Sequence, residues 1–292
     1  MSPPLWVARV ELDNHEWQWQ SGPYDALGFT FTLRSDHRAL GEELHRLLSG
    51  FTGPAAHEAH PMCLSIIDRG KAAEPDRFVT YLDEERASVS PGTDHLVRIL
   101  LWQLTPRAVA AATDRLVIHA GAVARRGRAI VIPGSPDAGK STLTAALLDA
   151  GCEFLSDEAA VLNLSTGLVE AFPRPLSLDP GSFSLLPHLA PHPATTDLVR
   201  NQWFVVPDEV APPCPPAMVI LPHVRPGTAS ELEPVTRSTA LVALAESAFN
   251  LGACGSRGFR ALGEVVRRAT CVRLYFGQLP GTADLILRTP LA

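Results

Sequence analysis

The sequence predicts an α/β protein in which a small α+β domain, residues 1–112, precedes a larger α/β domain, residues 113–292. The 292-residue chain is long enough for two domains, and its 46% hydrophobic and 19% charged residues suffice for a buried core. Before residue 112, strand-like alternation is mixed with helical spacing. After it, apolar strands and helices follow one another in quick succession, which is typical of layered α/β structures.

Alternation of apolar and polar residues predicts the strands of the first domain, at residues 8–13, 17–20, 29–35 and 78–85. A helix within residues 37–51 is predicted by the helical spacing of Leu40, Leu44, Leu47 and Leu48. A later helix is expected to begin at a Thr93 or Asp94 cap, with Pro106 near its end or inside a second helix.

Apolar runs bounded by turns predict the strands of the second domain, at residues 115–124, 128–134, 152–158, 217–224 and 271–279. Helices are expected at residues 141–149, where Gly151 ends the helix, and at 238–252 and 259–270. Residues 171–182 and 187–196 are rich in proline and are predicted to form loops.

Charge and cysteine content exclude several classes of protein. The net charge of −6 and pI of about 5.9 argue against a general binder of nucleic acid or anionic membranes. No apolar run reaches the ~18–20 residues of a membrane span, and the first residues carry charges and prolines unlike a signal peptide. The five cysteines are widely spaced and are expected to be reduced core residues. We therefore expect a cytoplasmic protein.

Residues 134–141 match the phosphate-binding pattern G-x-x-x-x-G-K-[ST] at every defined position, between a predicted strand and a predicted helix. Glycines allow main-chain N–H groups to surround phosphate oxygens, Lys140 supplies a charge for the β- and γ-phosphates, and the Ser141 hydroxyl is a natural Mg²⁺ ligand. The alternative is a glycine-rich turn with an exposed lysine. The pattern predicts binding of ATP and Mg²⁺ by Gly134, Ser135, Pro136, Asp137, Ala138, Gly139, Lys140, Ser141 and Thr142.

An acidic pair, Asp157 and Glu158, follows Ser141 after only 16 residues. One helix and one strand fit between them, so Asp157 is expected at the end of a strand beside the phosphate-binding loop. There it would hold Mg²⁺ or accept the proton of an acceptor hydroxyl. The alternative is a surface pair that caps the next element.

The stretch from His119 to Glu158 resembles the catalytic core of the HPr kinase/phosphorylase superfamily, and is most similar to the bacterial HPr kinase-related (type A) kinases. The resemblance spans about residues 114–288. It implies a P-loop kinase domain of the HPr kinase and phosphoenolpyruvate carboxykinase type, which phosphorylates a Ser or Thr hydroxyl of a protein or peptide, and it is compatible with a homo-oligomer. By this resemblance His119, Lys140 and Asp157 are catalytic, and Ser141, Asp157 and Glu158 are metal ligands.

From the residues alone, His119 in an apolar strand is equally well read as a buried structural histidine. Arg174 is a candidate for binding phosphate or the acceptor, or a turn arginine, and Arg237 is a candidate charge stabiliser or a solvated side chain. The chain departs from the family in having Asp-Glu in place of two aspartates and Asp179 in place of a usual lysine. It also lacks the signature of the phosphorylase reaction, so neither HPr nor the reverse reaction is predicted.

Two further functions stay open: a small-molecule kinase of the shikimate or gluconate kinase kind, and a nucleotide-gated binding module without transfer activity. The first domain is not needed for the predicted chemistry. It is a candidate for acceptor recognition by strand addition at its sheet edge, with Trp17 and Trp19 as apolar anchors. The alternative is that these tryptophans fill the core of that domain.

Overall fold

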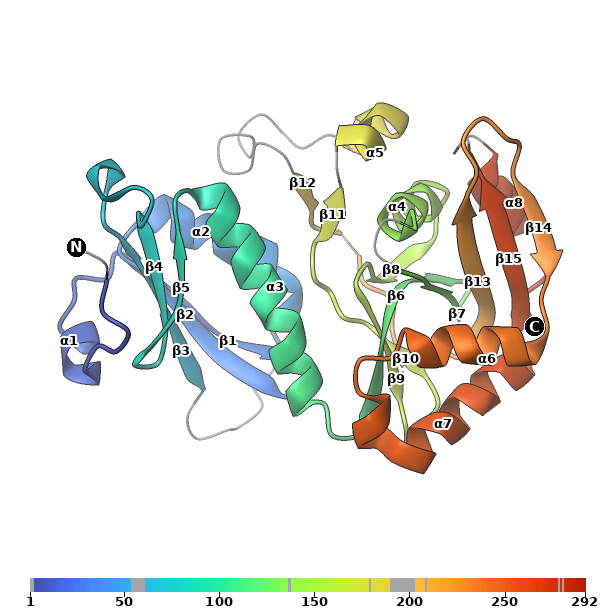
Figure 1. The fold of residues 1–292 in the computed structure, drawn as a ribbon, viewed down its shortest axis with the longest axis horizontal. Coiled ribbons are helices and arrows are strands. Elements are labelled where there is room, and N and C mark those ends of the chain that lie inside the picture. Colours follow the sequence, from blue (N-terminus) through green and yellow to red (C-terminus); the bar gives the residue numbers. More distant parts are fainter. Residues whose placement is uncertain are drawn as a thin grey trace. The chain divides into compact units, whose positions relative to one another are not determined.

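The computed structural model describes residues 3–53, 61–135, 138–178, 180–189, 203–207, 209–277, 279 and 281–292 (Figure 1). The chain forms two compact units: a first unit of Met1–Ala111 and Pro191–Val206, and a second unit of Ala112–Ala190 and Pro207–Ala292. Both contain helices packed on a sheet of mixed strand orientation. The structure is therefore of mixed α/β class, as the sequence predicts.

The first unit is built on a five-stranded sheet in the order β1-β2-β3-β4-β5. Its strands are β1 (Trp19–Ala26), β2 (Phe29–Ser35), β3 (Met62–Asp68), β4 (Phe78–Leu82) and β5 (Glu85–Ser90). The pair β2–β3 is parallel and the other pairs are antiparallel. Two longer helices, α2 (Arg38–Leu48) and α3 (Thr93–Ala111), pack on this sheet, and Pro106 lies inside the single helix α3.

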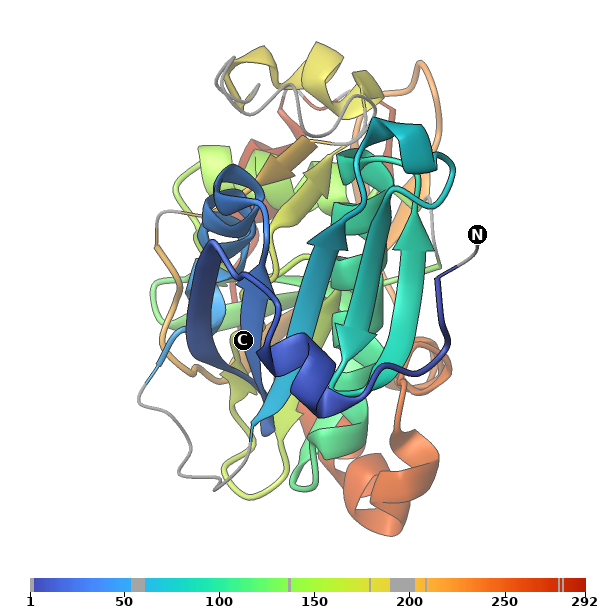
Figure 2. The same cartoon turned by 90° about the vertical axis from the view of Figure 1, so that its left-hand side faces the viewer.

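The prediction of a strand at residues 8–13 is wrong, because this segment forms the short helix α1 (Arg9–Asp13). Of its two apolar residues, Leu12 packs against Val79 and Tyr81, whereas Val10 is 63% exposed. Six alternating residues fit one helical turn as well as a strand, and burial of Leu12 alone decides between them. In Figure 2, α1 lies in front of the sheet and α3 behind it.

The second unit is built on an eight-stranded sheet in the order β10-β9-β6-β7-β13-β15-β14, with β8 paired to β6. Its strands are β6 (Arg115–Arg125), β7 (Arg128–Pro133), β8 (Glu153–Ser156), β9 (Ala159–Asn163), β10 (Val169–Glu170), β13 (Pro216–Val224), β14 (Glu231–Pro234) and β15 (Thr270–Phe276). β7, β13 and β15 are parallel, and the remaining pairs are antiparallel. Two short strands lie outside both large sheets: β11 (Leu176–Leu178) belongs to the second unit, and β12 (Trp203–Val205) belongs to the first.

Helices cover both faces of the second sheet (Figure 1). Helices α6 (Arg237–Glu246) and α7 (Leu251–Arg268) pack on the face that carries Leu116, Ile118 and Ala120. Helix α4 (Lys140–Asp149) packs against Gly121 on the other face, where a Cβ would lie 2.5 Å from Thr144 Oγ1. Gly121 therefore allows α4 to approach the strand closely.

Two helices form where the sequence predicts none. α5 (Pro180–Leu185) begins inside the predicted proline-rich loop, where a proline suits the first helical position, and α8 (Thr282–Arg288) follows the last strand. Both are short, and helices of this length depend on tertiary packing. In the described part of the chain, no helix is long and apolar enough to cross a membrane.

Candidate functional site

The register of the β6–β7 hairpin places His119 beside residues 134–141, the predicted phosphate-binding loop. Ala120 pairs with Pro133, the last residue of β7, so His119 lies level with Gly134 at the start of the loop. On its other edge β6 pairs with β9, and His119 is opposite Ala159, the residue after the acidic pair. The histidine of β6, the loop after β7 and the acidic pair before β9 are therefore close together, because β6 pairs with both of the other strands.

The phosphate-binding loop leads directly into α4. Gly139 precedes the helix with a φ of 81°, and its main-chain oxygen accepts a hydrogen bond from the Leu143 amide at 2.9 Å. A Cβ on Gly139 would lie 2.8 Å from Cζ of Phe276, at the end of β15. Both the left-handed conformation and the close contact require glycine. Pro136 and Asp137 lie outside the described residues.

Lys140 is buried within this loop, with 7% of its surface exposed. Its Nζ atom donates hydrogen bonds to the main-chain oxygens of Gly134 at 2.9 Å and Ser135 at 2.8 Å. This arrangement does not fit the alternative of a turn with an exposed lysine. Two residues after Lys140, the Thr142 hydroxyl lies 2.8 Å from Ser182 Oγ of α5.

Asp157 is buried between β8 and β9, with 5% of its surface exposed. Its Oδ2 atom accepts a hydrogen bond from the Ser177 amide at 3.1 Å, whereas Oδ1 is buried and makes no hydrogen bond within the described part of the chain. Burial raises the pKa of Asp157 to about 6, although the nearby Ser141 hydroxyl, the Ser177 amide and Arg174 oppose that rise. The alternative of a surface pair therefore does not hold for Asp157.

Glu158 differs from its neighbour in being partly exposed and charge-paired. Its Oε1 atom lies 3.6 Å from Nδ1 of His119, and its Oε2 atom lies 3.5 Å from Nη1 of Arg174. Arg174 is thus brought into the site through Glu158, and it also acts electrostatically on Asp157. The two acidic residues have different surroundings: Asp157 is buried near Ser141, and Glu158 lies between His119 and Arg174.

The surroundings of His119 favour its neutral form. Burial and the nearby Lys140 lower its pKa, and the Glu158 carboxylate only partly offsets them. Its Nδ1 atom is 3.2 Å from the main-chain oxygen of Glu158. Because a carbonyl oxygen can only accept a hydrogen bond, Nδ1 carries the proton and Nε2 has a free lone pair.

Three further residues shape the site without a clear signal in the sequence. Phe249, 46% exposed, stands edge-on to His119 with ring centroids 5.5 Å apart, and Ser177 and Phe276 make the contacts described above. Arg237, by contrast, lies near Cys271 at the start of β15, where its charge opposes the rise in the pKa of that thiol caused by burial. This is the end of the parallel strands away from the loop.

The oxygen atoms at this position suit a magnesium ion. Mg²⁺ prefers one or two carboxylates together with hydroxyl, water and phosphate oxygens. The Asp157 carboxyl group, whose Oδ1 atom has no partner among the described residues, and the nearby Ser141 hydroxyl supply two such donors. Within the described residues no group of three or more His, Cys, Asp or Glu side chains converges on a metal position, so a site held by protein side chains alone is not seen there.

Comparison with known proteins adds no relative. No family model matches the chain, and no curated protein matches it. The chemistry of the site must be argued from its own residues.

Proposed function

We propose that the chain is an ATP-dependent phosphotransferase that phosphorylates a Ser or Thr hydroxyl of a protein or peptide in the cytoplasm. In this proposal the second unit is a P-loop kinase domain of the HPr kinase and phosphoenolpyruvate carboxykinase type, and the first unit is a small N-terminal domain. The observation that carries the proposal is the buried carboxyl group of Asp157, which lies near the Ser141 hydroxyl at the end of the loop and has one oxygen, Oδ1, without a partner among the described residues.

The arrangement of the parallel strands supports a nucleotide site at this loop. The loop follows the carboxyl end of β7, which is parallel to β13 and β15. Ligands of α/β sheets bind at the carboxyl ends of such strands. When ATP binds, the Lys140 Nζ atom would exchange its hydrogen bonds to the main-chain oxygens of Gly134 and Ser135 for hydrogen bonds to phosphate oxygens. Ser141 and Asp157 would hold Mg²⁺, which supplies positive charge for the phosphates.

The proposed transfer moves one proton and one phosphoryl group. The oxygen of the acceptor hydroxyl forms a bond to the γ-phosphorus, and Asp157 accepts the proton that this hydroxyl loses. The bond from that phosphorus to the oxygen bridging it to the β-phosphate then breaks, and ADP leaves. His119 offers an acceptor nitrogen beside Glu158, and Arg174 offsets part of the negative charge of the two carboxylates.

Incubation of the protein with γ-labelled ATP, Mg²⁺ and a cell lysate tests the proposal. A labelled protein or peptide is expected. A labelled metabolite would instead identify a small-molecule kinase, and ATP binding without any labelled product would identify a nucleotide-gated module.

Asp157→Asn keeps the size of the side chain but removes the base, so transfer should fall by roughly 10²–10⁴-fold. Transfer near the wild-type rate in that variant would assign the base to another residue, with Glu158 as the next candidate.

A further inference from the structure

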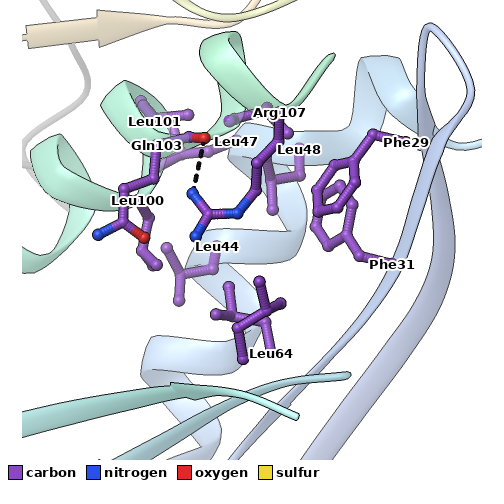
Figure 3. Close-up of a pocket in the computed structure, with 12 residues that line it drawn as sticks. Phe29, Phe31, Leu44, Leu47, Leu48, Leu64, Leu100, Leu101, Gln103 and Arg107 are labelled. Atoms are coloured by element: carbon purple, nitrogen blue, oxygen red, sulfur yellow. Dashed lines mark hydrogen bonds between the residues drawn. The ribbon is translucent and has the colours of Figure 1, made fainter. Parts of the chain in front are cut away.

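The first unit contains a cavity of about 40 Å³ between α2, α3 and the sheet (Figure 3). Its walls are leucines and phenylalanines, among them Phe29, Phe31, Leu44, Leu48, Leu100 and Leu104. Among the described residues that line it, only Gln103 and Arg107 are polar, and both belong to α3. Phe29, Leu64 and Arg107 keep part of their surface exposed, so the cavity opens to the outside of the unit.

Arg107 lies over these apolar side chains (Figure 3). Its Nη1 atom donates to the main-chain oxygen of Gln103 at 3.0 Å, and within the described part of the chain it takes part in no ion pair. In Figure 3 the guanidinium points toward Leu44 and Leu100. A guanidinium has several donors in one plane, and a carboxylate is the anion that matches them. The cavity thus combines an apolar chamber with one site for a carboxylate.

The walls of the cavity favour a small molecule over an extended peptide. The strands that contribute to it, β2, β3 and β4, are interior strands paired on both sides. They present side chains to the cavity and offer no free row of main-chain donors and acceptors for strand addition. The volume also limits the ligand: at ~10–15 Å³ for each water-sized group, it admits about three such groups, which corresponds to the branched end of a short alkyl chain with the rest of the ligand at the mouth.

We propose that this cavity binds a short branched aliphatic carboxylic acid. The alkyl chain would lie among the leucines and phenylalanines, and the carboxylate would bind the Arg107 guanidinium. This site lies in the first unit, and the proposal does not rest on the proposed phosphotransfer. It would hold even if the protein transferred no phosphate.

Three probes test the chemistry of the site on the full chain, by calorimetry or ligand-observed NMR. The branched acid 3-methylbutanoate should bind saturably, and its uncharged counterpart 3-methylbutanamide should bind at least about tenfold more weakly, because one charge-assisted contact is lost. Octanoate should bind no more tightly, since its longer chain exceeds the cavity. N-acetyl-leucine binding more tightly than 3-methylbutanoate would overturn the assignment in favour of a peptide C-terminus.

Two variants locate the binding. Arg107→Gln should weaken 3-methylbutanoate binding at least about tenfold, and Leu64→Phe should block it by filling the chamber from a partly exposed wall position. Arg98→Gln is the matched control, because Arg98 is an exposed arginine on the same helix that does not line the cavity. Absence of saturable binding to the wild-type protein, or binding unchanged by Arg107→Gln, would overturn the proposal.

Discussion

The Nδ1 atom of His119 lies 3.2 Å from the main-chain oxygen of Glu158 and 3.6 Å from Oε1 of the same residue. The main-chain contact sets the tautomer of the imidazole, and the carboxylate contact influences its charge. Lys140 and Arg174 act on the same imidazole in the opposite direction. The protonation of His119 therefore reports on the whole site.

The first prediction concerns this balance of charges. Glu158→Gln removes the carboxylate that raises the pKa of His119, so that pKa should fall further below its ordinary value. Lys140→Ala removes a cation that lowers the same pKa, so the value should rise. NMR titration of the His119 ring protons in the two variants measures both shifts. Shifts of the same sign in both variants would contradict this account of the site.

A second prediction tests nucleotide binding through the only two lysines of the chain. Lys140→Ala should weaken the affinity for ATP with Mg²⁺ by at least ~1.5–3 kcal/mol, the scale of a hydrogen bond to a charged group. Lys71→Ala removes an exposed lysine of the first unit and should leave that affinity unchanged. Calorimetry decides, and equal affinities in the two variants would remove the basis for a phosphate-binding loop.

The third prediction compares two glycines with left-handed backbones. Gly139 and Gly151 have φ values of 81° and 90°, but only at Gly139 would a Cβ meet another side chain, that of Phe276. Gly151→Ala should cost about 1 kcal/mol of the free energy of unfolding. Gly139→Ala should cost more and should also weaken ATP binding, because the loop must shift. Urea unfolding and calorimetry measure the two effects, and identical losses in both variants would show that the contact with Phe276 is unimportant.

The fourth prediction concerns stability and pH in the metal-free protein. The folded state raises the pKa of Asp157 from 3.8 to about 6, so it binds a proton more tightly than the unfolded chain between these values. The free energy of unfolding should therefore fall as pH rises from about 4 to about 6, by at most ~3 kcal/mol from this group. Asp157→Asn has no such group, and its stability relative to wild type should increase over that range.

Urea unfolding at several pH values in the presence of a chelator measures this difference. Asp284→Asn is the control, because Asp284 is exposed and the same replacement there should change stability little. A difference between Asp157→Asn and wild type that does not vary with pH would mean that Asp157 titrates normally in the folded protein.

Much of the local structure could be predicted from the sequence. The hairpin of β6 and β7, the loop before α4 and the mixed α/β class depend on apolar runs, glycines and turn residues that lie close together in the chain. The helix of residues 9–13 could not, because its alternating pattern fits two structures and only the packing of Leu12 on β4 selects one. Trp17 and Trp19 show the same limit: Trp17 packs against the Leu12 cluster, and Trp19 packs on Gly41 of α2.

For the candidate site, too, some features could be predicted from the sequence and others depend on the tertiary structure. The sequence by itself determined which residues have the chemistry for a phosphate-binding loop and an acidic pair, since these are patterns of adjacent residues. Only the tertiary structure decided that Asp157 is buried with an unpaired oxygen whereas Glu158 joins His119 and Arg174. The physical reason is that the ionisation of a carboxyl group depends on solvent exclusion and on nearby charges. For this pair, the strands and loops that exclude solvent and supply those charges come from segments distant in the sequence.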